Sequence, residues 1–201
     1  MLTELVNDGA VALAVQCGYM DELLRLPTAA AARALIGVDV EASALVAAEA
    51  NARQHDLAQQ CVLARADAWE LTGATVVFGD ITSYERAVDG GVDVVVSNGL
   101  NMYVPDDDEV ISLYRSFRQP LRRGGTLVVS ALTPPAAWDL SHVPKEVITR
   151  VRGLMLINPM MWGNYRSVAV TCAQLAAAGL EVRDIRFDQR RIFPTFVATA
   201  L

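Results

Sequence analysis

The stretch from Val92 to Val110 most constrains the fold. Its apolar run VDVVV stops at Ser97, Asn98 and Gly99 and is followed by polar, turn-prone residues. The run is rich in β-branched valine, which is typical of a parallel strand buried on both faces of an α/β sheet. Ligands of open α/β sheets bind beyond the carboxyl ends of such strands. We therefore expect Asn98, Gly99 and Asn101 to border a ligand, while an ordinary turn is the alternative, since Asn-Gly is a common turn dipeptide.

The composition indicates one globular unit. The chain has 201 residues, of which 53% are hydrophobic and 20% charged, enough for one well-buried domain spanning 1–201 and short for two. A formal net charge of -6 and the lack of a dense Lys/Arg face argue against a nucleic-acid partner. The densest basic spot, Arg122 to Gly125, is interpreted as the end of a helix closed by glycine.

Cysteine and histidine usage argues against disulfides and against a metal centre. Cys17, Cys61 and Cys172 are odd in number and widely spaced, with no CxxC pair. His55 and His142 are the only histidines and lie far apart in the sequence. The first residues carry no basic segment, and no apolar run reaches the roughly 18 residues of a membrane span. We expect a cytoplasmic protein with no membrane partner and no metal.

Strand and helix patterns alternate along the chain, which predicts an α/β fold with a parallel sheet. Short apolar runs predict strands at 10–15, 34–40, 92–97 and 126–132, and helical spacing predicts helices at 43–55, 109–121 and 171–178. Asp106, three residues before Glu109, is a typical helix start. The last two strands, 181–187 and 192–200, are joined by a short link that permits only an antiparallel hairpin.

A mostly parallel sheet closed by such a hairpin resembles the class I S-adenosylmethionine-dependent methyltransferases. The resemblance rests on the order and spacing of GVDVEASALVAAEANAR, ADAWEL, VDVVVSNGLNMYVPDDDEV, PLRRGGTLVVSALTPP and QLAAAGLEV with FPTFVA. NGLNMY, LTPP and WGNYRS are also similar to a subgroup of uncharacterised small-molecule methyltransferases. The resemblance implies a Rossmann-like, seven-stranded doubly wound sheet, S-adenosylmethionine as cofactor, and a small-molecule acceptor methylated on O, N or C.

The resemblance also implies cofactor-binding residues after each of the first strands. The corresponding positions are Cys17, Gly18, Asp39, Val40, Asp67, Ala68, Trp69, Ser97, Asn98 and Gly99. In the family, the acid matching Asp39 accepts both ribose hydroxyls, and two carboxylate oxygens suit a vicinal diol. A helix cap is the alternative for Asp39. Asp67 matches the acid on the adenine side, and Asp80 is the alternative. Choosing Asp67 makes 75–87 an insertion.

The first loop departs from the family pattern. Where the family has an acid and three glycines, this chain has ALAVQCGYM, with Ala14 at the acid position and with Gln16 and Met20 replacing two glycines. This departure favours an alternative function, a non-catalytic subunit of the methyltransferase fold that serves as a binding or assembly partner. A nicotinamide-dependent oxidoreductase is the third reading, but it predicts a GxGxxG turn that the sequence lacks.

The substrate side of the site is expected in the segment 133–166, because only about nine residues precede the first strand and something else must cover the pocket. Its apolar residues are Trp138, Met155, Met160, Met161 and Trp162. A second subunit, as in a homodimer, is the alternative cover. We expect Asn101, Tyr103, Trp162 and Arg166 to contact the substrate, with catalytic roles for Tyr103 and for His142 as a general base.

Overall fold

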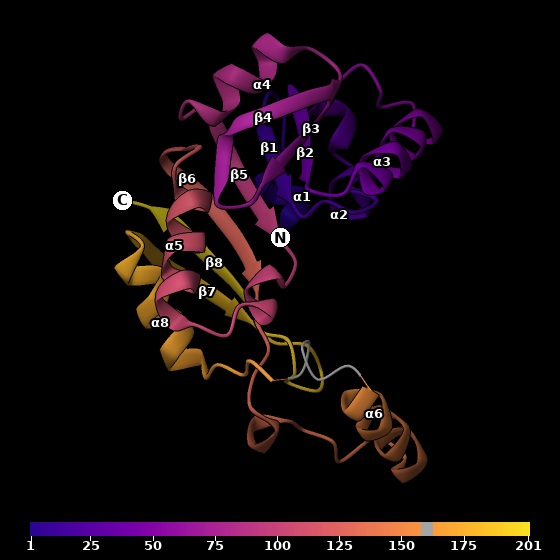
Figure 1. Cartoon of the computed structure of the whole chain (residues 1–201), viewed down its shortest axis with the longest axis vertical. Coiled ribbons are helices and arrows are strands. Elements are labelled where there is room, and N and C mark those ends of the chain that lie inside the picture. Colours follow the sequence, from indigo (N-terminus) through magenta and orange to yellow (C-terminus); the bar gives the residue numbers. More distant parts are fainter. Residues whose placement is uncertain (158–162) are drawn as a thin grey trace.

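The protein is built on a single mixed sheet, whose strands are drawn as arrows in Figure 1. The computed structural model describes residues 1–157 and 163–201. Its strands are β1 (Val11–Val15), β2 (Ala34–Asp39), β3 (Cys61–Asp67), β4 (Glu70–Phe78), β5 (Val92–Ser97), β6 (Leu121–Ser130), β7 (Leu180–Arg186) and β8 (Thr195–Ala200). Within the described ranges these eight strands have the order β4-β3-β2-β1-β5-β6-β8-β7. The predicted α/β, Rossmann-like class is confirmed.

Strand pairing reproduces the expected doubly wound core and adds one strand. The pairs β1–β2, β2–β3, β1–β5 and β5–β6 are parallel. The predicted C-terminal hairpin is present, because β8 pairs antiparallel with both β6 and β7. The eighth strand, β4, folds back on β3 as an antiparallel edge strand. The segment 75–87, expected to be an insertion, therefore forms the end of β4 and most of the helix that leads to β5.

Helices cover both faces of the sheet, as a doubly wound fold requires. The α-helices are α1 (Leu2–Leu5), α2 (Asp21–Leu24), α3 (Ala42–Gln54), α4 (Ile81–Val88), α5 (Asp107–Arg118), α6 (Lys145–Ile157) and α8 (Val168–Ala177). Side chains alternate along β1: Val11 and Leu13 join the core that contains α4, α5 and α8, while Ala12 joins the core under α1, α2 and α3. The first strand, β1, lies at the centre of the sheet, and the strand order reverses between β1 and its parallel neighbour β5.

The start of α5 agrees with the sequence, whereas the basic segment that follows it does not. The Asp106 carboxylate accepts hydrogen bonds from the amides of Asp108 and Glu109, at 2.8 and 2.9 Å, as an N-cap. The basic segment from Arg122 to Gly125 was expected to end this helix, and that prediction is wrong, because α5 ends earlier and the segment lies in β6. Arg122 there pairs with Asp93 of β5, so its charge serves a strand contact.

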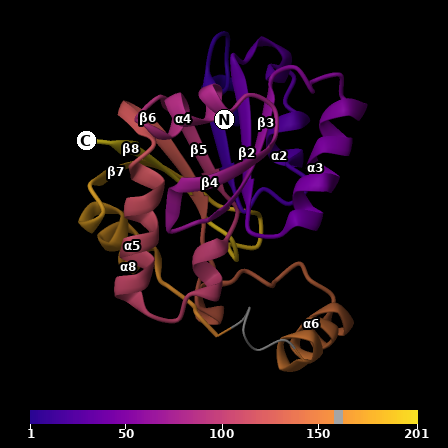
Figure 2. The ribbon, with the colours of Figure 1, turned by 45° about the horizontal axis from the view of Figure 1, so that its top comes forward.

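The segment that leads through α6 lies at one end of the molecule. In Figures 1 and 2, α6 stands apart from the sheet and from the helices that cover it. No helix within the described residues is long and apolar enough to cross a membrane.

Candidate functional site

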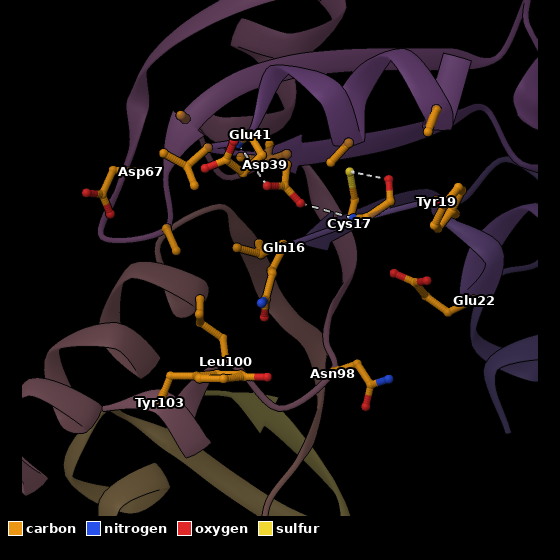
Figure 3. A pocket seen from close by; sticks show the side chains of 18 of the residues that line it. Gln16, Cys17, Tyr19, Glu22, Asp39, Glu41, Asp67, Asn98, Leu100 and Tyr103 are labelled. Atoms are coloured by element: carbon orange, nitrogen blue, oxygen red, sulfur yellow. Dashed lines mark hydrogen bonds between the residues drawn. The ribbon is translucent and has the colours of Figure 1, made fainter. Parts of the chain in front are cut away.

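A cavity of about 1150 Å³ opens beyond the carboxyl ends of β1, β2, β3 and β5, where the strand order of the sheet reverses (Figure 3). Its volume is slightly above the roughly 300–1,000 Å³ usual for small-molecule pockets, and its position is the one that open α/β sheets use for ligands. The expected residues that line it are Cys17, Gly18, Asp39, Val40, Asp67, Ala68, Trp69, Asn98 and Tyr103. The fold therefore brings together groups that are up to 86 positions apart by sequence number, from 17 to 103.

Asp39, the last residue of β2, is buried and is held in place by the backbone. Its two oxygens accept hydrogen bonds from the amides of Gly18, at 3.1 Å, and Glu41, at 3.0 Å. Glu41, not Asp39, is the N-cap of α3, so the cap alternative does not apply. A carboxylate offers about four acceptor positions, and one bond to each oxygen leaves both oxygens able to accept from a ligand. The geometry fits the two hydroxyls of a ribose.

The variant first loop adopts left-handed backbone conformations at the two positions where other residues replace glycine. Gln16 and Met20 both have a φ of 60°, in the left-handed region. The Met20 side chain is fully buried and points into the core, where Gly37 makes room for it: a Cβ at Gly37 would lie 3.0 Å from the Met20 sulfur. Only Gln16 projects into the cavity, as Figure 3 shows. Met20 therefore leaves the pocket open, whereas Gln16 takes up part of it.

The β3 side of the pocket decides between the two rival acids. Asp67 lines the cavity and accepts a hydrogen bond from the amide of Trp69 at 2.9 Å, which fixes the turn after β3. Asp80 instead is the N-cap of α4, where its carboxylate accepts from the Ser83 amide at 2.8 Å. It borders a separate hollow near the first residues of β2 and β3, at the opposite edge of the sheet. The structure thus places Asp67, and not Asp80, in the cavity.

The loop after β5 contributes less to the cavity than the sequence predicts. Asn98 and Tyr103 line it, whereas Ser97, Gly99 and Asn101 do not. Asn101 is buried, and its side-chain amide donates to the Tyr114 hydroxyl at 2.9 Å. The expected contact of Asn101 with substrate is therefore corrected to a packing role inside the core.

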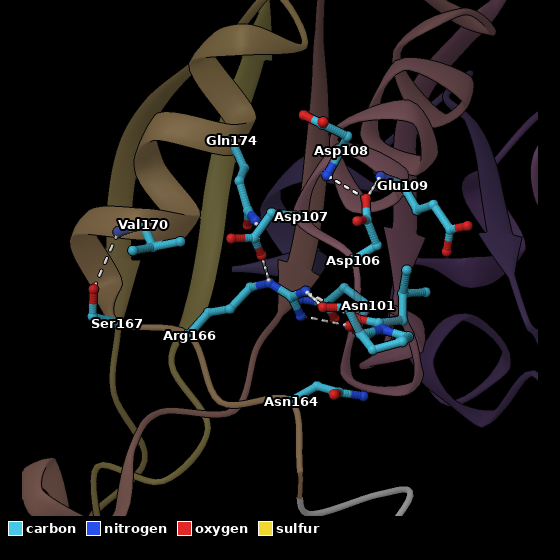
Figure 4. Close-up of polar contacts among 12 residues, drawn as sticks. Asn101, Asp106, Asp107, Asp108, Glu109, Asn164, Arg166, Ser167, Val170 and Gln174 are labelled. Atoms are coloured by element: carbon cyan, nitrogen blue, oxygen red, sulfur yellow. Dashed lines mark hydrogen bonds and ion pairs between the residues drawn. The ribbon is translucent and has the colours of Figure 1, made fainter.

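Arg166 is likewise a structural residue (Figure 4). Its buried guanidinium pairs with Asp107 at 2.8 Å and donates to the carbonyl oxygens of Asn101, Val104 and Pro105, at 3.1, 2.8 and 3.3 Å. The three bonds to carbonyl oxygens fix the loop that carries Tyr103, and the pair with Asp107 ties Arg166 to the start of α5, so the guanidinium is not free to bind a substrate carboxylate. The predicted substrate contact of Arg166 is replaced by this clamp on the wall of the pocket.

The segment 133–166 contributes no described residue to the lining of the cavity. His142 is exposed, and the Trp138 indole donates to the Thr133 carbonyl oxygen at 2.9 Å, outside the lining. The expected general-base role of His142 finds no support in this placement. Trp162, Met160 and Met161 lie outside the described residues, as does the side chain of Met155, so those predictions stay predictions.

The lining is acidic. Among its described residues, four carry carboxylates and none is Lys, Arg or His; the acids are Glu22, Asp39, Glu41 and Asp67. Burial raises the pKa of the Glu22 carboxyl above its ordinary value. The sequence analysis did not identify Glu22 and Glu41, which lie at the starts of the helices that follow β1 and β2. It also did not identify Phe193, which reaches the cavity from the link between β7 and β8. An acidic, cation-free pocket favours a positively charged ligand.

Comparison with known proteins reveals similarity in solved structures alone: no protein-family model and no curated protein matches the chain. A structure of a possible exported protein from Bordetella parapertussis is 35% identical, with a TM-score of 0.83 over 99% of this chain. This chain spans 64% of the length of that protein. The magnesium protoporphyrin IX methyltransferase of Synechocystis PCC 6803, with bound S-adenosylhomocysteine, is 17% identical with a TM-score of 0.65, over 96% of this chain and 75% of its own.

A third similar structure is the geranyl diphosphate C-methyltransferase of Streptomyces coelicolor A3(2), at 14% identity and a TM-score of 0.65, over 100% of this chain and 76% of its own. The fold is that of the S-adenosylmethionine-dependent methyltransferases. The methyltransferase fold agrees with the resemblance seen in the sequence, while no family model matches that could support the subgroup or the variant first loop. The expected cytoplasmic location is overturned, because the 35% identical protein is described as a possible exported protein.

Proposed function

We propose that this protein binds S-adenosylmethionine in the acidic cavity and transfers its methyl group to a small molecule. The observation that carries the proposal is the Asp39 carboxylate, which is buried, anchored by the amides of Gly18 and Glu41, and turned toward a cavity of about 1150 Å³. A carboxylate held in this way is ready for a vicinal diol without rearranging. The methyltransferase fold of similar structures supports the same ligand.

The lining residues divide the cavity into parts that suit the parts of the cofactor. Ala68 and Trp69, beside β3, offer an apolar surface for a purine ring, and Asp67 offers an acceptor for its amino group. Asp39 holds the ribose. The cofactor supplies a methyl group on a positively charged sulfur, and the carboxylates around it, with no opposing cation in the described lining, favour that charge.

The acceptor would enter beside the loop after β5. Leu100, Met102 and Tyr103 present an apolar wall there, and the Arg166 clamp holds that wall in position. Methyl transfer is an in-line displacement, so the main tasks of the protein are alignment and exclusion of water. Tyr103 is the described hydroxyl on this wall and is proposed to orient the acceptor. Closure of the pocket by the segment 133–166 or by a second copy remains a proposal.

The alternative is a non-catalytic subunit that has lost its cofactor. The projection of the Gln16 side chain into the cavity favours it, because this side chain competes for space with a ligand (Figure 3). The position of Met20, buried away from the cavity, opposes it.

Calorimetric titration with S-adenosylmethionine and S-adenosylhomocysteine separates the two functions. We expect micromolar binding, about -7 to -8 kcal/mol, and the absence of binding up to millimolar ligand would refute the proposal. Asp39→Ala should weaken binding by about 1–3 kcal/mol, since it leaves the ribose hydroxyls unpaired. The matched control is Asp80→Ala, which removes a carboxylate at the opposite edge of the sheet and should leave the affinity unchanged.

A further inference from the structure

One carboxylate of the cavity receives no hydrogen bond or ion pair from any other residue that the structure describes. Glu22 lies in the first turn of α2, is partly buried and lines the cavity. Among the described residues, no other residue donates a hydrogen bond to its side chain and no cation pairs with it. The three other acids of the lining differ: Asp39 and Asp67 accept backbone hydrogen bonds, and Glu41 is exposed. Burying a carboxylate that no neighbouring residue neutralises is unfavourable, so we expect a positively charged group of a ligand to lie beside Glu22.

The strand order gives the direction in which a nucleoside would run past Glu22. Trp69 follows β3 and Asp39 ends β2, so a purine against Trp69 and a ribose on Asp39 point the 5′ substituent toward the ends of β1 and β5. Figure 3 shows this spatial order across the pocket, with Asp67 on one side, Asp39 in the middle, and Glu22 and Asn98 on the other side. Whatever is attached to the 5′ carbon therefore arrives at Glu22.

The neighbouring groups fit an amino-acid tail, which carries both an ammonium and a carboxylate. Asn98 has its side-chain oxygen occupied by the Ser130 hydroxyl, at 2.7 Å, which leaves its amide hydrogens as donors for an anion. Ala14, near the end of β1, is fully buried between Gly37 and Val96 in the sheet and offers no charge. Glu22 is the remaining carboxylate on this side of the cavity.

We propose that Glu22 binds the ammonium group of the amino-acid tail of the cofactor, with Asn98 as a donor to the carboxylate of the same tail. This inference rests on the proposed function. Glu22 of α2 would thus supply the carboxylate for the ammonium group, because β1 has the uncharged Ala14 near its end. The raised pKa of Glu22 agrees with it, because an ammonium placed beside this buried carboxylate would relieve the unfavourable burial.

The test compares two ligands that differ in the tail. S-adenosylhomocysteine carries the ammonium, whereas 5′-methylthioadenosine has the same nucleoside and thioether without the amino acid. We expect Glu22→Gln to weaken S-adenosylhomocysteine at least about tenfold, the effect of losing a hydrogen bond to a charged group, and to change 5′-methylthioadenosine by less than about twofold. Glu41→Gln makes the same change of charge on the ribose side and should shift both ligands by the same factor.

The outcomes separate this inference from the proposed function. If the wild-type protein binds both ligands and Glu22→Gln weakens both equally or neither, Glu22 does not hold the tail and the proposed function stands. If the wild-type protein binds neither ligand, both proposals fail. Thermal unfolding of Glu22→Gln checks the fold, and its stability at pH 7 should equal or exceed that of the wild type, since an unpaired buried carboxylate is removed.

Discussion

Replacing Asp39 by asparagine should destabilise the protein even without a ligand. Each Asp39 oxygen accepts a hydrogen bond from one backbone amide, from Gly18 at 3.1 Å and from Glu41 at 3.0 Å, and the residue is only 7% exposed. Asparagine keeps one acceptor oxygen and turns an NH₂ group toward the other amide. One buried donor is then left without a partner, which costs about 1–3 kcal/mol.

Urea unfolding at pH 7 measures this loss. For a chain of this length, 1 kcal/mol moves Tm by about 2–4 °C, so Asp39→Asn should lower Tm by about 2–12 °C. The urea midpoint should fall while the m-value stays constant, which reports a change in stability alone. Glu41→Gln is the matched control, because it neutralises an exposed neighbour and should stay within about 0.5 kcal/mol of the wild type. Equal stability of the two variants would refute the argument that Asp39 is anchored by the backbone.

Three further predictions concern the walls of the pocket. Gly37→Ala should destabilise the protein by about 1–3 kcal/mol in urea, because the new Cβ would lie 2.8 Å from the Leu63 side chain; an unchanged midpoint would contradict the packing described here. Arg166→Met should cost about 3 kcal/mol, the lower end for breaking a buried pair, since Asp107 is itself 65% exposed; a loss below 1 kcal/mol, measured in the same way, would show that the clamp is not needed. Burial raises the pKa of the Cys17 thiol, so at pH 8 it should stay protonated and react with a disulfide reagent no faster than the protein opens, and rapid labelling of the folded protein would exclude this burial.

The sequence alone determined the elements and their order. The valine run of β5, the acid that ends β2, the Asp106 cap and the C-terminal hairpin were all predicted, because each depends on residues that are close neighbours in the chain. Their agreement with a doubly wound sheet also located the pocket, since the carboxyl ends of parallel strands meet at one edge. The extra strand β4 was not expected, because the sequence analysis took its last residues as part of an insertion. In the structure β4 pairs with β3.

Only the tertiary structure decided which side chains face the pocket. Met20 turns into the core because Gly37, on a neighbouring strand, leaves a space for it, and nothing local to Met20 indicates that space. Arg166 turns toward three carbonyl oxygens about 60 residues away in sequence, and Glu22 faces the cavity with no partner on another described residue. Periodicity gives the face of an element on which a residue lies, but the groups that meet that face come from distant segments, and their packing is set by the whole fold.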